Sequence, residues 1–124
     1  QFSLTIIDDL DISLSKDSFM HIINNLVRNA MESIKEEGEI HIIQRLSSDK
    51  KNLLIEVEDS GIGFDKRHYK KIFEPFFTTK EEGTGLGLYI CKLLVASDGG
   101  DISAKRRDGL TCFTISYPVF QKKD

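Results

Sequence analysis

The sequence predicts an α+β fold in which helices cover one face of a mostly antiparallel sheet. Apolar residues recur at helical spacing in two segments, within 15–38 and 87–98. Short β-like segments lie before and between these helices and after the second, and most are paired across polar turns. With 124 residues, of which 40% are hydrophobic and 30% charged, the chain is expected to form a single domain, residues 1–124.

The expected elements run from an edge strand through a long helix, a hairpin, a long loop and a second helix to a second hairpin. Ser15 or Asp17 can cap the long helix, which is predicted to end near Gly38. The second helix is predicted to stop at Gly99–Gly100, and Asp108–Gly109 suits a tight hairpin turn. The strands are expected at 2–7, 39–46, 52–57, 101–107 and 110–117, and the loop at 60–86 with a helical turn at 66–72.

Composition excludes several classes of protein. The net charge of −3 argues against a nucleic-acid-binding surface, and Lys105-Arg106-Arg107 is interpreted as the solvated end of a hairpin. The sequence has no apolar run of about 18 residues and no signal-like start, so we expect no membrane insertion. Cys91 and Cys112 are isolated and show no metal-ligand spacing, which favours a reduced, cytoplasmic setting.

A first glycine cluster follows the strand predicted at 52–57. In Asp59-Ser60-Gly61-Ile62-Gly63 the glycines let the chain turn sharply and leave room for a flat ligand. The Asp59 carboxylate can accept a hydrogen bond from an exocyclic amine. An ordinary glycine turn is the alternative, and it is the more frequent case for such a segment alone.

A second glycine cluster, Gly83-Thr84-Gly85-Leu86-Gly87, opens the second helix. Free amides at a helix N-terminus, assisted by the helix dipole, form a phosphate site. The segment matches neither GxxxxGK[ST] nor GxGxxG, because Ile90 stands where the latter has its last glycine.

Two further segments carry polar groups suited to a phosphorylated ligand. Asn25, Asn29 and Glu32 share one stripe of the long helix, where their oxygens could bind magnesium or simply face solvent. The segment Phe73–Lys80 places three aromatic residues beside a proline. These rings could pin the loop and leave Lys80 to contact a phosphate, or they could form a satellite hydrophobic cluster with a surface lysine.

Together the four segments resemble the catalytic, ATP-binding domain of sensor histidine kinases, in the superfamily that includes the gyrase, heat-shock chaperone and mismatch-repair ATPases. The resemblance covers nearly the whole chain, and FEPFFTTK followed by GTGLGL is highly specific. It implies the Bergerat fold, a mixed, mostly antiparallel sheet with about three helices on one face and a flexible lid over ATP. The matching segments are Asn25–Ala30 (N box), Asp59–Gly63 (first glycine box), Phe73–Lys80 (F box) and Gly83–Leu88 (second glycine box).

The resemblance also implies a role for each matching residue, with ATP and Mg²⁺ as ligands. Asn29 would coordinate magnesium and Asn25 would support the phosphate end. Asp59 would read the adenine amine, and Lys80 would reach the γ-phosphate, so that Asn29 and Lys80 are the implied catalytic residues. The glycine boxes would shape the adenine pocket at Gly61 and Gly63 and bind the phosphates at Gly83, Thr84, Gly85, Leu86 and Gly87.

The sequence departs from the family pattern at three positions and differs from the related ATPases at a fourth. Glu32 and Ser33 stand where many members have a basic and an aromatic residue, so no ring stacks on adenine from there. Together with the Thr-Thr-Lys ending of the F box, this is more similar to the nitrogen-regulator type of sensor kinase. Asp98 replaces a usual histidine, which we expect to affect only the helix end. Asn25 replaces the glutamate that activates water in related ATPases, so fast ATP hydrolysis is not expected.

The implied activity is transfer of the γ-phosphoryl group of ATP to a histidine in two-component signalling. His21, His41 and His68 all lack the sequence context of an acceptor. The acceptor is therefore expected on separate dimerisation helices of a longer kinase, of which this chain is the C-terminal piece, and the response regulator would be reached through that kinase. The alternatives are a nucleotide-binding regulatory module without catalysis and an anti-sigma-type serine kinase on the same fold. The matches at Asn29, Asp59 and Lys80 disfavour the first alternative and the F box disfavours the second.

Overall fold

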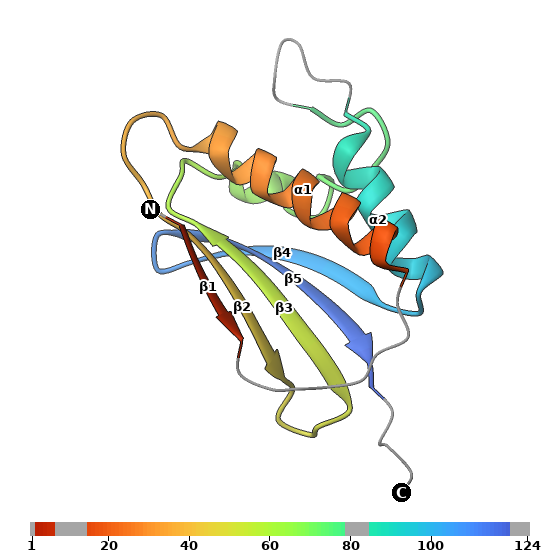
Figure 1. Ribbon diagram of the computed structural model, residues 1–124. Coiled ribbons are helices and arrows are strands. Elements are labelled where there is room, and N and C mark those ends of the chain that lie inside the picture. Colours follow the sequence, from red (N-terminus) through yellow and green to blue (C-terminus); the bar gives the residue numbers. More distant parts are fainter. Residues whose placement is uncertain (1, 7–14, 79–84, 120–124) are drawn as a thin grey trace, which may run out of the picture.

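The computed structural model describes residues 15–78 and 85–119, and the backbone of residues 2–6. Two layers are present, a five-stranded sheet and a helical layer on one of its faces (Figure 1). The strand order is β1-β2-β3-β5-β4, in which β1 is parallel to β2 and every other pair is antiparallel. The elements are β1 (Phe2–Ile6), α1 (Lys16–Ser33), β2 (Ile40–Leu46), β3 (Asn52–Asp59), the 3-10 helix η1 (Lys66–His68), α2 (Gly87–Ser97), β4 (Asp101–Arg107) and β5 (Leu110–Pro118).

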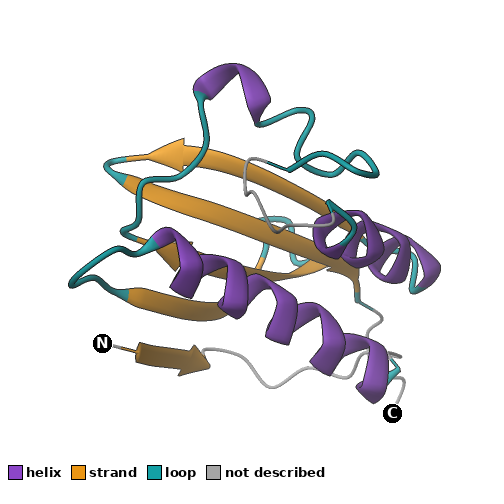
Figure 2. Ribbon diagram, turned by 90° about the horizontal axis from the view of Figure 1, so that it is seen from above, coloured by secondary structure: helices purple, strands orange, loops and turns teal. Residues whose placement is uncertain are grey.

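The α+β class and the mixed, mostly antiparallel sheet are therefore confirmed. The helical layer consists of α1, α2 and η1 in the residues that the structure describes (Figure 2). The third helical element is thus a single turn at 66–68, shorter than the predicted 66–72. The strand at the start of the chain lies at the edge of the sheet, as predicted.

Helix α1 begins as predicted and ends earlier than predicted. Ser15 caps it, because the Ser15 hydroxyl accepts a hydrogen bond from the Ser18 N–H at 3.3 Å. The helix ends at Ser33 rather than near Gly38, and Ile34 is already extended. The backbone carbonyl of Ser33 accepts the N–H of Ile62 at 3.2 Å, a bond to the loop after β3. This distant partner, which the local sequence does not reveal, satisfies one of the free carbonyls at the helix end.

The second hairpin, β4–β5, has the predicted two-residue turn. Asp108 and Gly109 both have positive φ angles, 52° and 78°, as a type I′ turn requires. Counting outward from this turn, Arg106 pairs with Thr111. On the other side of β5, Thr111 pairs with Asp59, the last residue of β3. Strand β3 thus runs two residues beyond its predicted end, because the sheet pairs Asp59 on both sides.

The core fills the space between the sheet and the two helices. The apolar stripe of α1 is buried at Ile22, Leu26 and Ala30, as its spacing predicts. Cys91 on α2 also belongs to this core, and its thiol is free. The other core residues are Ile40, Ile42, Leu53, Ile55, Val57, Ile72, Phe73, Val95, Ile102, Phe113, Ile115 and Tyr117.

Aromatic contacts fix the long loop after β3 to this core. Phe73 is buried and meets Phe113 edge-to-face, with ring centroids 6.1 Å apart. Phe77 is half-buried and contacts the ring of His68, whereas Phe76 is 74% exposed. Phe73 and Phe77 thus pack this loop against the core, which is one of the two roles that the sequence left open for the F-box rings, while Phe76 is exposed.

Candidate functional site

A cavity of about 290 Å³ lies between the C-terminal half of α1, the loop after β3 and the start of β5. Its volume is close to the lower end of small-molecule sites, about 300 Å³. Three of the predicted site residues, Asn29, Asp59 and Gly63, meet in its wall although they are far apart in the sequence. The lining residues are Asn29, Glu32, Ser33, Lys35, Asp59, Ile62, Gly63, Phe64, Thr111 and Phe113.

Asp59 provides a buried carboxylate in the cavity wall, with 1% of the residue exposed. Its Oδ1 accepts the N–H of Gly61 at 2.9 Å. Burial raises the pKa of Asp59, against the opposing effects of the Gly61 N–H, the charge of Arg106 and a hydrogen bond with Ser33. The carboxylate is therefore a fixed hydrogen-bond acceptor that has been placed in the wall at some cost in stability.

Because burial of the Asp59 charge lowers the stability of the fold, Asp59→Asn is predicted to stabilise the ligand-free protein at pH 7. The folded pKa is raised above the unfolded value, so burial of the ionised carboxylate opposes folding at neutral pH and this penalty disappears as the pH falls. The free energy of unfolding of the variant should exceed that of the wild type at pH 7. This difference should shrink as the pH is lowered through the folded pKa of Asp59 towards 3.8, the ordinary pKa of an aspartate. Urea unfolding at a series of pH values measures this difference. A variant that is less stable than the wild type at pH 7 would contradict it.

The two glycines of the first cluster sit where a side chain has no room. A Cβ on Gly61 would lie 2.6 Å from the backbone carbonyl atoms of Ser33. Gly63 has a φ of 69°, and its Cβ would lie 2.7 Å from both the Nη1 of Arg106 and the Oγ1 of Thr111. The two glycines thus allow close packing within the protein, with α1 behind Gly61 and β4–β5 behind Gly63, whereas the predicted room for a flat ligand stays a prediction.

Ser33 braces this glycine loop from the end of α1. Its hydroxyl accepts the N–H of Gly63 at 3.2 Å and forms a hydrogen bond with Asp59. The residue at this position is a serine rather than an aromatic residue, and its small polar side chain holds the loop through these two hydrogen bonds. The local sequence does not predict this contact, since it joins residues 30 positions apart.

The three polar residues of the α1 stripe, Asn25, Asn29 and Glu32, do not all face the cavity. Asn29 and Glu32 line the cavity and bring oxygen atoms of the kind that magnesium binds. Asn25 does not line this cavity. Its side chain forms a hydrogen bond with the thiol of Cys91 on α2, and burial raises the pKa of that thiol to about 11. The donor set at Asn29 and Glu32 fits a magnesium ion, whereas Asn25 lies between the two helices.

Helix α2 begins within the second glycine cluster and has no side-chain cap. Gly87 is exposed, and a Cβ added there would meet no atom within 4 Å. The carbonyl of Gly85, whose φ is 73°, accepts the N–H of Phe76 at 2.8 Å and so joins this helix to the F box. The predicted site residues Lys80, Gly83 and Thr84 lie outside the described residues.

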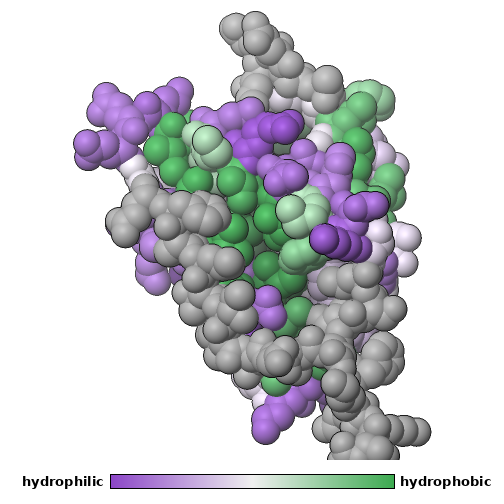
Figure 3. Space-filling view, viewed as in Figure 1, coloured by the Kyte–Doolittle hydropathy of each residue, from purple (hydrophilic) through white to green (hydrophobic). Residues whose placement is uncertain are grey.

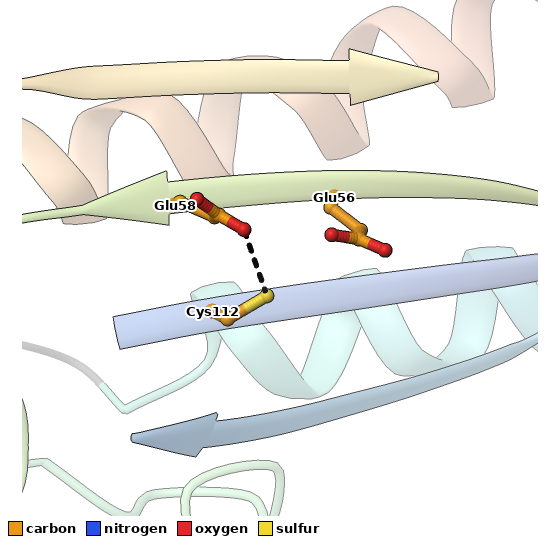
Figure 4. A group of neighbouring side chains, drawn as sticks. All are labelled: Glu56, Glu58 and Cys112. Carbon is orange, nitrogen blue, oxygen red and sulfur yellow. Dashed lines mark hydrogen bonds between the residues drawn. The ribbon is translucent and has the colours of Figure 1, made fainter. Parts of the chain in front are cut away.

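A group of acidic side chains and a thiol lies on the opposite face of the sheet (Figure 4). Glu56 and Glu58 alternate along β3 with the residues that face the helices. Glu56 pairs with Arg45 at 2.6 Å and Glu58 with Arg107 at 3.6 Å, while the Sγ of Cys112 lies 3.9 Å from Glu58. The arginines balance both carboxylates, so this group is interpreted as part of the sheet rather than as a metal site.

A larger hollow of about 890 Å³ borders α1 on the face seen in Figure 3, where apolar side chains gather along the helix. Its lining is Val27, Met31, Ile34 and residues 36–40, which include three glutamates and none of the predicted site residues. We therefore take the smaller cavity as the candidate functional site, because predicted site residues line it.

Residues 15–121 match the family of histidine kinase-, DNA gyrase B-, and HSP90-like ATPases, and the chain belongs to this family. Membership of an ATPase family implies a site for ATP. Its fold is that of the catalytic domain of sensor histidine kinases, as the resemblance predicted. None of the described helices has the length and apolar character needed to cross a membrane.

Two curated relatives show how much of a sensor kinase this chain represents. The sensor protein TdiS of Thauera aromatica is 40% identical over 113 residues, which cover 87% of this chain and 21% of TdiS. The signal transduction histidine-protein kinase AtoS of Escherichia coli is 35% identical over 125 residues, covering 96% of this chain and 20% of AtoS. The chain thus spans about a fifth of the length of these relatives.

Solved structures of histidine kinases have the same fold as this chain. The nucleotide-free catalytic domain of histidine kinase ThkA superposes with a TM-score of 0.82 at 32% identity, over 95% of this chain and 78% of that one. ThkA has also been solved in complex with the response regulator TrrA, where the match has a TM-score of 0.78 at 29% identity and covers 96% of this chain and 34% of that one.

Proposed function

We propose that this chain binds Mg-ATP in the 290 Å³ cavity and donates the γ-phosphoryl group to a histidine on separate dimerisation helices. The observation that carries the proposal is the buried carboxylate of Asp59 facing the same cavity as Asn29 and Gly63. These residues occupy the positions that the family uses for adenine, magnesium and the adenine loop. Residues 1–124 would form one cytoplasmic domain of a longer sensor kinase.

At the adenine end, Asp59 accepts a hydrogen bond from the exocyclic amine of the base. Its Oδ1 is already held by Gly61, so the acceptor does not have to reorganise on binding. Gly61 and Gly63 pack against Ser33 and against Arg106 and Thr111, which holds the glycine loop in place beside Asp59. A fixed acceptor at this end supports a base that carries an exocyclic amine.

At the phosphate end, the resemblance assigns the phosphate oxygens to the backbone of Gly85, Leu86 and Gly87, where α2 begins. The resemblance adds Gly83, Thr84 and Lys80 to this end, and Asn25 as a support between α1 and α2. Asn29, with Glu32 beside it, would hold the magnesium ion, which supplies positive charge to the phosphates when it is bound. Catalysis in such a site consists mainly of positioning and charge neutralisation.

Gly87→Ala tests the phosphate end. The new methyl group meets no protein atom within 4 Å and replaces a glycine at the start of a helix, so the free energy of unfolding should stay the same or rise by up to about 1 kcal/mol. The same methyl group occupies space that the phosphates need, so ATP affinity should fall by about tenfold. Thermal unfolding and calorimetric titration measure the two effects. Unchanged affinity for ATP would remove Gly87 from the site.

The proposed reaction is tested by mixing the chain with γ-labelled ATP and a histidine-bearing helical domain of a related sensor kinase. We expect label on the helical domain in an acid-labile and alkali-stable form, as phosphohistidine requires. ATP binding without any transfer would indicate a non-catalytic nucleotide-binding module. An acid-stable product would indicate a serine kinase of the anti-sigma type.

We further propose that the parent protein is a kinase of the nitrogen-regulator type that passes its phosphoryl group to a response regulator. The sequence Asn-Ala-Met-Glu-Ser at the end of α1 and the Thr-Thr-Lys ending of the F box support the type. The complex of ThkA with its response regulator supports the partner class.

A further inference from the structure

Arg106, an exposed residue of the edge strand β4, contacts two residues beside the 290 Å³ cavity without lining the cavity itself. Its Nη1 donates one hydrogen bond to the carbonyl of Gly61 at 2.7 Å and another to the Oγ1 of Thr111 at 2.8 Å. The two N–H bonds of Nη1 are both used in this way. One nitrogen thus ties the glycine loop to the end of β5, although Arg106 stands in a basic run whose sequence is typical of a solvated hairpin end.

The bond from Arg106 determines what the Thr111 hydroxyl can do. A threonine hydroxyl has one hydrogen to donate and two lone pairs that accept. Thr111 is 1% exposed and lines the cavity, and its oxygen accepts from Arg106. In the part of the chain that the structure describes, no protein acceptor takes the hydroxyl hydrogen, which leaves it available to a ligand inside the cavity.

The cavity wall therefore combines a fixed acceptor with a fixed donor. Asp59 and Thr111 are direct partners across β3 and β5. The edge of a 6-aminopurine carries an amine donor beside a ring-nitrogen acceptor, whereas a 6-oxopurine carries a carbonyl acceptor beside an N–H donor. A hydroxyl that must donate pairs with the ring nitrogen of the first base and opposes the N–H of the second.

We propose that Arg106 is a positioning residue that makes the site selective for aminopurines by forcing the Thr111 hydroxyl to donate into the cavity. The inference rests on the proposed ATP site. Arg106 acts through Thr111 and Gly61, and it does not touch the phosphates. Its positive charge also favours the ionised form of the neighbouring Asp59, which keeps that carboxylate an acceptor.

The test compares the dissociation constants of Mg-ATP and Mg-ITP, its 6-oxopurine analogue, for the wild type and for Arg106→Met. Without the arginine, the Thr111 hydroxyl can turn and accept the N–H of the oxopurine. We expect the preference for ATP over ITP to fall by about fivefold, the contribution of one neutral hydrogen bond. Arg107→Met is the matched control, because Arg107 is the next residue of β4 and its ion pair with Glu58 lies on the opposite face. Its preference should stay within about twofold of the wild type.

Three results would overturn the inference alone. The first is a wild type that binds ATP and ITP equally well, and the second is an Arg106→Met variant whose affinities for ATP and ITP fall by the same factor. Both would leave the proposed function standing, whereas a wild type that binds neither nucleotide would overturn the proposed function as well. If Arg106→Met does not fold, Arg106→Lys serves instead. It keeps the charge but presents a single nitrogen on a flexible stem, and it should lie between the wild type and the fivefold loss. A preference equal to the wild type in that case is the third overturning result.

Discussion

Asp59→Asn is expected to weaken ATP binding by about ten- to a hundredfold while the protein stays folded. A hydrogen bond to a charged acceptor contributes about 1.5–3 kcal/mol, and the variant loses this charge. The asparagine has nearly the same shape, and its oxygen can still accept the N–H of Gly61, now 2.9 Å from Oδ1. Its amide nitrogen then faces the amine of the base as a second donor. Calorimetric titration with Mg-ATP measures the loss.

Asp65→Asn is the matched control for this experiment. Asp65 is an exposed aspartate that accepts the N–H of Arg67 at 3.1 Å and caps η1, outside the cavity lining. ATP affinity of this variant should stay within about twofold of the wild type, because its charge is screened by solvent. An Asp59→Asn variant that binds as tightly as Asp65→Asn would show that Asp59 does not read the base.

Gly61→Ala is expected to damage both the fold and the site. The new Cβ would lie 2.6 Å from the carbonyl carbon and oxygen of Ser33, which are backbone atoms and cannot rotate away. The loop must then move off α1, which breaks the 3.2 Å bond from Ile62 to the Ser33 carbonyl. Overpacking of this kind costs about 1–3 kcal/mol of stability. We also expect more than tenfold weaker ATP binding, since Asp59 is hydrogen-bonded to Gly61.

The urea midpoint of Gly61→Ala, compared with that of Gly87→Ala, measures the structural part of this effect. Both variants add one methyl group to a glycine of the predicted site, but only Gly61 is buried against the backbone. The midpoint should fall for Gly61→Ala and hold or rise for Gly87→Ala. Equal midpoints for the two variants would contradict the packing of the glycine loop against α1.

The sequence predicted those parts of the fold that depend on neighbouring residues. The Ser15 cap and the Asp108–Gly109 turn are local, and both are confirmed. The end of α1 was misplaced because the bond between Ser33 and Ile62 joins segments that meet only in the folded chain. The end of β3 was misplaced for the same reason, since Asp59 belongs to the strand only through its partners on β2 and β5.

Some residues around the candidate site could be predicted from the sequence and others could not. Asn29, Asp59 and Gly63 were found from motifs, and the structure brings them to one cavity. Thr111 and Arg106 were missed because they belong to no motif. The two-residue hairpin does give their pairing, but their position beside Asp59 follows from the pairing of β3 with β5, which are separated by the loop and α2. Composition and periodicity hold no signal for that contact.

The most direct test of the central claim is an amide NMR titration of the 124-residue chain with Mg-ATP. We predict that the resonances of Gly61 and Gly63 shift with both adenosine and Mg-ATP, and that the resonance of Gly87 shifts only when the phosphates are present. The competing hollow on the other side of α1 contains the amide of Glu37. Shifts centred on Glu37, with Gly61 and Gly63 unchanged, would contradict the assignment of the ATP site.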